Sequence, residues 1–379
     1  MLFKGIKLVI LGIASLALVS QAMAQDATLA APKFGFDYRA GLTYDDHGIE
    51  DYDGAADDPS ATTNIDLEVA RLSATGEAAK NVTYKFRYNL LSNKVEVGMV
   101  KLKHSDMISF SAGRMKVNQG GYNVKKEAYN NVSPGSEYNH SMPFEKYSDM
   151  FGLHFNLLGT LTVQILDDVQ HERTTNDDGA VLSDNGFKND KAKGPAMTVE
   201  WMGDFDGWKP LVQLSSYDLN KSMYFVLGVQ GKAAGLGLSL DYIMDNRTNH
   251  QYADDGTTRT GEDAKNVLTG INAEVNYAMA DFTPWVEYHS YANKQGDNKD
   301  AGMEDQEGNV AVATSMASES DYWDDNGTSI SVGTNCNAMG QGYTPYLAVV
   351  QQSGKFLKAD GETETLSNLM VKLGVFGAF

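Results

Sequence analysis

The sequence predicts an all-β protein, a transmembrane antiparallel up-and-down β-barrel of about 16 strands. Three observations predict it. Apolar and polar residues alternate nearly everywhere after the first 24 residues, the long connections fall only on alternate junctions, and only the N-terminal segment is apolar enough to be considered as a membrane helix. A period of two is typical of strands with one apolar face, whereas a helix would repeat every 3.6 residues.

The chain begins with a segment that has the layout of a secretory signal. Lys4 and Lys7 precede the 12-residue apolar run Leu8–Val19, and Ala22-Met23-Ala24 supplies small residues at the cleavage positions. This run is too short to cross a bilayer, which needs about 20 residues. We therefore expect residues 1–24 to be a cleaved signal peptide and residues 25–379 to be an exported barrel domain. A buried or amphipathic N-terminal helix is the less favoured alternative.

The composition narrows the class of protein. The 379 residues include 50 acidic and 31 basic side chains, which gives a formal net charge of −19. Such a charge repels a phosphate backbone, so we expect no nucleic-acid partner. The single Cys excludes an intramolecular disulfide, and 42% hydrophobic with 21% charged residues indicates a folded chain.

The strands are recognised one after another by their alternation. In the first, Phe34, Phe36 and Tyr38 share one face and Asp37 and Arg39 share the other. The pattern recurs in 16 segments, at 33–45, 64–76, 81–90, 94–104, 107–117, 149–158, 160–169, 195–203, 209–218, 222–231, 235–245, 265–279, 281–292, 327–334, 342–352 and 366–379. Every even-numbered junction is short, so all long loops lie on one side of an up-and-down sheet.

Closure of this sheet follows from its size. An open sheet of so many long strands would expose two edges and a large apolar face, and a barrel removes both edges. An apolar exterior, a polar lumen, short turns on one side and long loops on the other describe a membrane barrel, and about 16 strands leave an aqueous channel. Aromatic residues near strand ends would form the interfacial girdles: Phe34, Tyr44, Tyr88, Tyr277, Tyr288 and Phe379.

Two stretches resemble known families. The last strand, Leu369–Phe379, alternates and ends in Phe, and it resembles the terminal signal of Gram-negative outer-membrane barrels that the barrel-insertion machinery reads. The strands Ala70–Leu72, Asn81–Tyr88, Val100–Lys103 and Ala112–Val117 are similar to the N-terminal strands of the phosphate-selective porin O and P family.

This resemblance implies a homotrimeric pore in the outer membrane, in contact with lipid and lipopolysaccharide. It also implies a third outer loop that folds into the barrel, here about residues 118–148. The sequence lacks a dense ladder of inward Arg and an obviously Lys-rich third loop, so phosphate selectivity does not follow from the resemblance.

The candidate pore-lining residues come from a local excess of positive charge. Between Ala70 and Asn130 there are 11 basic and four acidic residues. A Lys or Arg facing lipid at the midplane costs about 2–4 kcal/mol, which favours an inward direction. The predicted lining is Arg39, Arg71, Lys85, Arg87, Lys101 and Lys103 on strands one to four, Arg114 and Lys116 on strand five, and Lys125, Lys126, Glu127 and Glu137 in loop three.

These side chains allow two interpretations. In the first, a basic wall opposite the carboxylates of loop three creates a transverse electric field across the pore. In the second, the basic residues simply line a wide lumen and pair with neighbouring acids. Alternation slips near Val69-Ala70, Met99-Val100 and Gly113-Arg114, where bulges would redirect side chains.

The sequence offers little for catalysis. No H-E-x-x-H or G-x-S-x-G motif occurs, and the adjacent His289 and Ser290 would point to opposite faces of their strand. The acidic cluster of Asp51, Asp53, Asp57 and Asp58 lacks EF-hand spacing, so we expect no metal site and no cofactor. We expect a non-enzymatic diffusion channel for small hydrophilic solutes and ions. The alternatives are a substrate-specific pore of the anion or phosphate type, and an outer-membrane barrel enzyme or adhesin.

Overall fold

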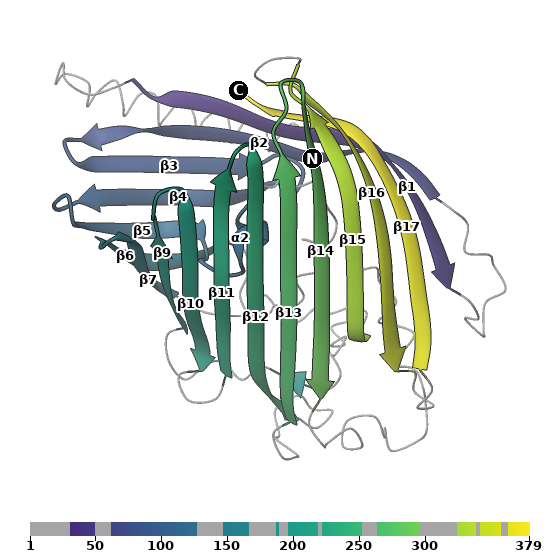
Figure 1. Cartoon of the computed structure of the whole chain (residues 1–379). Coiled ribbons are helices and arrows are strands. Elements are labelled where there is room, and N and C mark those ends of the chain that lie inside the picture. Colours follow the sequence, from purple (N-terminus) through teal and green to yellow (C-terminus); the bar gives the residue numbers. More distant parts are fainter. Residues whose placement is uncertain are drawn as a thin grey trace, which may run out of the picture.

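A closed wall of antiparallel strands forms the molecule (Figure 1). The computed structural model describes residues 31–49, 62–126, 147–166, 187–188, 196–218, 222–251, 264–295, 324–338, 342–357 and 363–379. The expected signal peptide, residues 1–24, lies outside the described residues.

Sixteen strands build the wall, and each pairs with the next in the chain. They are β1 (Lys33–Ile49), β2 (Thr62–Ala79), β3 (Val82–Asn89), β4 (Lys94–Lys103), β5 (Ile108–Lys116), β6 (Tyr147–Asn156), β7 (Gly159–Leu166), β9 (Ala196–Gly203), β10 (Trp208–Asp218), β11 (Ser222–Ala233), β12 (Leu236–Gln251), β13 (Ala264–Tyr277), β14 (Phe282–Gln295), β15 (Asp324–Cys336), β16 (Thr344–Leu357) and β17 (Thr363–Ala378). The two-residue strand β8 (Phe187–Lys188) pairs with the last residues of β12.

The first and last strands close the barrel. They pair antiparallel from Asp37 opposite Ala378 to Ile49 opposite Leu366. Phe36 and Phe379 exchange two backbone hydrogen bonds, of 3.1 and 3.0 Å, at the end of this ladder. The predicted closed barrel and its strand count are confirmed.

Several strands continue beyond their predicted ends. The segment expected at 235–245 extends to Gln251, because its polar residues keep pairing with β13 up to Asn249 opposite Ala264. Hydrophobic alternation detects only the part of a strand that crosses an apolar layer, so its polar continuation carries no such signal.

The connections define the two ends of the barrel. Short turns such as Lys80-Asn81 and Ala234-Gly235 lie at one end, here called the turn end. The opposite end is called the loop end, and the long connections predicted from the sequence begin there.

The wall is apolar outside and polar inside. On β10, exposed Val212 and Leu214 alternate with fully buried Gln213 and Ser215. Large apolar side chains are widely exposed on the outer face, for example Phe151 at 67%. This is the inverse of a soluble barrel, and it identifies a transmembrane barrel with a hydrophilic interior.

The helix α2 (Tyr122–Lys125) follows β5 and lies against the inner wall at β11 and β12. Among the described residues, no helix is long and apolar enough to cross a membrane.

Candidate functional site: the inner wall and the root of loop three

Three buried arginines face the lumen from the first strands of the wall, and each is paired. Arg39 Nε lies 2.6 Å from Glu68 Oε2. Arg71 holds Glu96 through two contacts of 2.8 Å, from Nε and from Nη2. Arg87 Nε lies 3.1 Å from the same carboxylate. Two guanidinium groups therefore share one Glu96.

Arg87 also contacts Tyr147 at the start of β6, three strands further along the wall. Its Nη2 donates to Tyr147 Oη at 2.6 Å, and its guanidinium carbon lies 5.3 Å from the centre of that ring. A planar guanidinium suits both contacts, because it presents N–H donors at its edge and a cationic face to the aromatic ring.

Two β-bulges place the carboxylates among the arginines. The β1–β2 register shifts between Arg39 and Ala40, which inserts Glu68 between Leu67 and Val69. The β3–β4 register shifts between Arg87 and Tyr88, which inserts Glu96 between Val95 and Val97. Each inserted residue points inward beside its arginine, as bulges commonly redirect side chains.

The bulge positions predicted from the sequence agree with the structure to different degrees. The expected irregularity near Val69 is within one residue of the first bulge. The one expected near Met99 occurs at Glu96 instead. At Gly113-Arg114 the β4–β5 register runs without the expected shift, although Gly113 has a φ of 114°.

The lysines of β3 and β4 occupy inward rows. Lys85 pairs with Met99, and Lys101 pairs with buried Ser111. Lys103 lies at the turn end, where its Nζ is 2.6 Å from Asp106 in the adjoining turn and both side chains are exposed. The hydrogen bond from Lys103 holds the pKa of Asp106 below its ordinary value.

Arg114 lies on the outer face, in contrast to the predicted pore lining. Its row runs from Gly98 through Arg114 to Asp149, and its two neighbours on β5 face inward. Arg114 Nη1 is 4.0 Å from Asp149 Oδ2. Because the register has no shift here, strand alternation decides the direction of this side chain.

The first residues of loop three lie against the inner wall. Gln164 Oε1 accepts from Asn118 N at 2.7 Å, and Gln213 Nε2 donates to Asn118 O at 2.8 Å. Gln164 Nε2 also donates to Lys116 O at 3.2 Å, and Lys116 Nζ donates to Lys125 O at 3.4 Å. Two wall glutamines thus hold the backbone where β5 leaves the wall.

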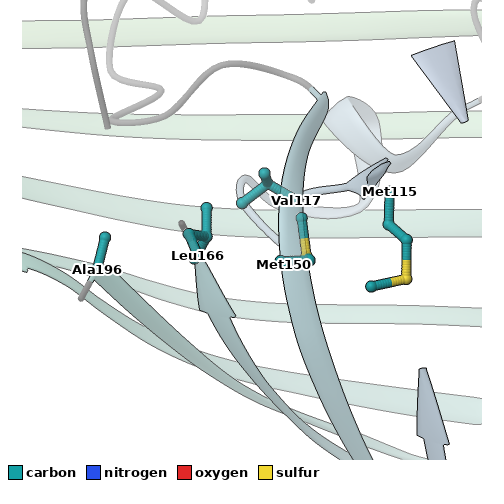
Figure 2. Packing of buried hydrophobic residues seen from close by; sticks show 5 residues of the cluster. All are labelled: Met115, Val117, Met150, Leu166 and Ala196. Carbon is teal, nitrogen blue, oxygen red and sulfur yellow. The ribbon is translucent and has the colours of Figure 1, made fainter. Parts of the chain in front are cut away.

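Two buried apolar clusters support the same segment. Figure 2 shows Val117 and Met115 beside Met150, Leu166 and Ala196 at the loop ends of neighbouring strands. Tyr122 of α2 packs against Leu211, Tyr224, Val226 and Ile243. The Tyr122 hydroxyl donates to Lys209 O at 2.7 Å, and burial raises the pKa of this phenol.

The two lysines that end this segment bind wall carboxylates. Lys125 pairs with Glu200 on β9. Lys126 pairs with Glu274 on β13 at 2.6 Å and with Glu287 on β14. Burial alone would lower the pKa of Lys126, but the carboxylates of Glu287 and Glu274 outweigh it and raise that pKa. Glu127 and Glu137 lie outside the described residues.

The charges are therefore arranged differently from the expected basic wall facing loop carboxylates. In the described residues, loop-three lysines pair with acids on β9, β13 and β14, while the arginines of β1–β3 pair with carboxylates of β2 and β4. Glu200, Glu274 and Glu287 were missed as site residues, although each lies on the polar face of a predicted strand. Glu68 and Glu96 were missed because their direction depends on bulges.

His289 is part of this acidic wall. It is buried and faces inward, with Nδ1 2.9 Å from Asn272 Oδ1 and Nε2 3.6 Å from Glu287 Oε2. Ser290 pairs with Ile271, which is exposed on the outer face. The two adjacent side chains therefore point to opposite faces.

A hydroxyl–imidazole contact does occur elsewhere on the inner wall. Ser111 Oγ is 2.8 Å from His154 Nε2, and His154 Nδ1 is 3.2 Å from Thr162 Oγ1. The third group is a hydroxyl, whereas a catalytic triad places a carboxylate there to stabilise an imidazolium. The arrangement is suited to a hydrogen-bonded network of the wall.

Comparison with solved structures shows what this architecture is similar to. The anion-selective porin from Comamonas acidovorans is 12% identical, with a TM-score of 0.57 over 92% of this chain and 99% of that one. In-vitro folded OmpT, an outer membrane protein of Vibrio cholerae in a trimer form, is 10% identical, with a TM-score of 0.55 over 92% and 100%. The outer membrane channel DcaP of Acinetobacter baumannii is 11% identical, with a TM-score of 0.55 over 91% and 97%.

At identities of 10–12%, these likenesses show the fold alone. No protein-family model matches the sequence. No curated protein sequence matches it either. The chain has the fold of the outer-membrane porins, a closed antiparallel barrel with an apolar exterior and a charged lumen. The narrower resemblance to the phosphate-selective porin O and P family stays a prediction.

Proposed function

We propose that the protein is an outer-membrane porin, a water-filled channel through which small hydrophilic solutes and ions diffuse without covalent chemistry. The observation that carries this proposal is the lumen itself. Charged side chains face inward on both sides of the barrel, with Arg39, Arg71 and Arg87 on one side and Glu200, Glu274 and Glu287 on the other. Such charges in a low-dielectric wall act on passing ions.

The test is an electrical recording from purified protein in a planar bilayer. We expect stepwise KCl conductance and a measurable reversal potential under a KCl gradient. A correctly folded protein that inserts without conductance would contradict the proposal and favour a barrel enzyme or adhesin.

A preference for anions is supported as a second, narrower proposal. Three arginines of β1–β3 share two carboxylates, so this wall keeps an excess positive charge. Arg71 Nη1 is buried and makes no hydrogen bond within the described part of the chain. A donor of this kind suits an oxyanion. Reversal toward the chloride potential, and competition by inorganic phosphate, would support an anion-type pore, whereas potassium preference would exclude it.

The proposal includes an assembly and a location. We propose a homotrimer whose apolar outer faces contact lipid and lipopolysaccharide, exported after removal of residues 1–24 and inserted through recognition of Phe379. Electrophoresis in mild detergent tests the assembly, because a trimer migrates slowly until heated. Migration as a monomer at all temperatures would contradict it.

A further inference from the structure

Three aromatic side chains lie together on the inner face near the turn end: Trp285 on β14, Tyr346 on β16 and Phe376 on β17. They form one buried cluster with Ala348. The rings of Tyr346 and Phe376 have their centres 6.0 Å apart at 34°. The inward direction follows from alternation, since Val286 and Leu347 next to them are exposed on the outer face.

Small residues form the floor beneath these rings. A Cβ added to Gly333 would lie 2.3 Å from Trp285 Cζ2, so the indole covers the neighbouring strand. A Cβ added to Gly41 or Gly374 would lie 2.7 or 2.8 Å from the Tyr346 hydroxyl. Both rings therefore lie along the wall, where only glycine leaves them room.

A lysine belongs to the same row of the wall as the indole. Trp285 pairs with Gly333, Gly333 with Ala348, and Ala348 with Lys372. The exposed fraction of Lys372 is 8%. Within the described residues its side chain makes no hydrogen bond or ion pair, and its Nζ is not among the fully buried side-chain atoms without a partner. Such an ammonium is available to pair with a carboxylate.

This patch differs from the two other apolar clusters of the inner face. Those clusters include Val117 and Tyr122, so they anchor the first residues of loop three. All four buried members of the aromatic patch belong to wall strands. The described part of loop three therefore does not account for it.

We propose that this patch is a binding site for solutes that carry an aromatic ring and a carboxylate. The ring stacks on Trp285 and Tyr346, and the carboxylate pairs with the ammonium of Lys372. An aliphatic carboxylate would gain only the ion pair, and a neutral aromatic only the stacking. The inference deepens the proposed porin function, because it names a substrate class for the lumen.

Block of KCl current by benzoate tests the site, with acetate at equal ionic strength as the matched anion. We expect benzoate, and not acetate, to block reversibly. Lys372→Met and Trp285→Leu should each weaken the block by about tenfold. Lys372→Arg keeps the charge and should retain the block. Lys80→Met, at an exposed lysine of the β2–β3 turn, and Trp201→Leu, on an outward row, are the matched controls.

The outcomes separate the site from the channel. Equal block by acetate and benzoate, or full block in both Lys372→Met and Trp285→Leu, would overturn the site while leaving the porin function intact. If the folded wild type shows no conductance, the porin proposal fails. Fluorescence of the detergent-folded protein then tests the site directly. Benzoate should change the emission of the wild type more than that of Trp285→Leu, and equal changes would overturn the inference.

Discussion

Lys126 and Glu287 are in contact although their strands lie far apart on the wall. Lys126 follows β5, and Glu287 lies on β14, which is eight strands further along a wall of sixteen. The same ammonium also binds Glu274. One side chain thus connects the root of loop three to the opposite half of the barrel.

Lys126→Met should make the pore more permeable to cations. The substitution leaves Glu274 and Glu287 without their ammonium, so the lumen gains a local negative charge. We expect the cation-to-anion permeability ratio to rise by about twofold or more. The reversal potential under a KCl gradient measures it, and an unchanged potential would mean that these carboxylates do not face the ion path. Lys80→Met, at an exposed lysine of the β2–β3 turn, is the matched control.

The ion pair between Lys126 and Glu287 should persist as the pH is raised, until conditions become strongly alkaline. The pKa of Lys126 is raised in the folded protein, so its contribution to stability is complete below the ordinary lysine value of 10.5. The contribution is lost as the pH rises through the raised value. We expect constant conductance from neutral pH to about pH 10 and a change above it. A transition that persists in Lys126→Met would have another origin.

Glu96→Gln should destabilise the barrel. Glu96 holds both Arg71 and Arg87, and breaking a buried ion pair costs about 3 kcal/mol or more. Urea unfolding in detergent, or the temperature at which the folded band disappears on gels, measures the loss. Glu77→Gln, at an exposed position on β2, should be neutral. Equal stability of the two variants would contradict the role of Glu96.

Gln164→Leu should loosen the root of loop three. The wall glutamine bonds Asn118 N, Lys116 O and Thr198 Oγ1, so its loss leaves buried polar groups unpaired at about 1–3 kcal/mol each. We expect lower stability together with noisier open-channel current. Gln351→Leu provides the control, because Gln351 is exposed on the outer face. An open-channel current in Gln164→Leu as quiet as that of the wild type would show that other contacts are sufficient to hold the root of loop three.

Substitution of Arg87 should shift the reversal potential, whereas substitution of Arg114 should not. Arg114 lies on the outer face, so Arg114→Leu should leave the reversal potential unchanged. Arg87 faces the lumen, so Arg87→Leu should shift the potential toward cation preference. A shift in Arg114→Leu equal to that in Arg87→Leu would contradict the outward placement.

The sequence predicted the barrel because alternation reports directly on which face of a strand meets an apolar phase. It therefore placed all sixteen wall strands and the lumen-facing Arg39, Arg71 and Arg87. The prediction failed where one inserted residue changes which face of the strand the side chains point to. Glu96 reaches the arginines only through a bulge, and Arg114 faces outward only because no bulge occurs beside it. The partners of Lys126 could not be predicted, because they depend on where the loop goes after leaving β5.

The pairing of the first strand with the last has a consequence during biogenesis. Until Phe379 reaches Phe36, the wall is a curved ribbon whose two edges carry unpaired backbone groups. Those edges belong to the first and the last strand of the wall, β1 and β17. An exposed edge recruits strands from other chains. Covering either strand until the two pair would therefore prevent association between chains, and loss of β17 would leave an open, aggregation-prone sheet instead of a smaller pore.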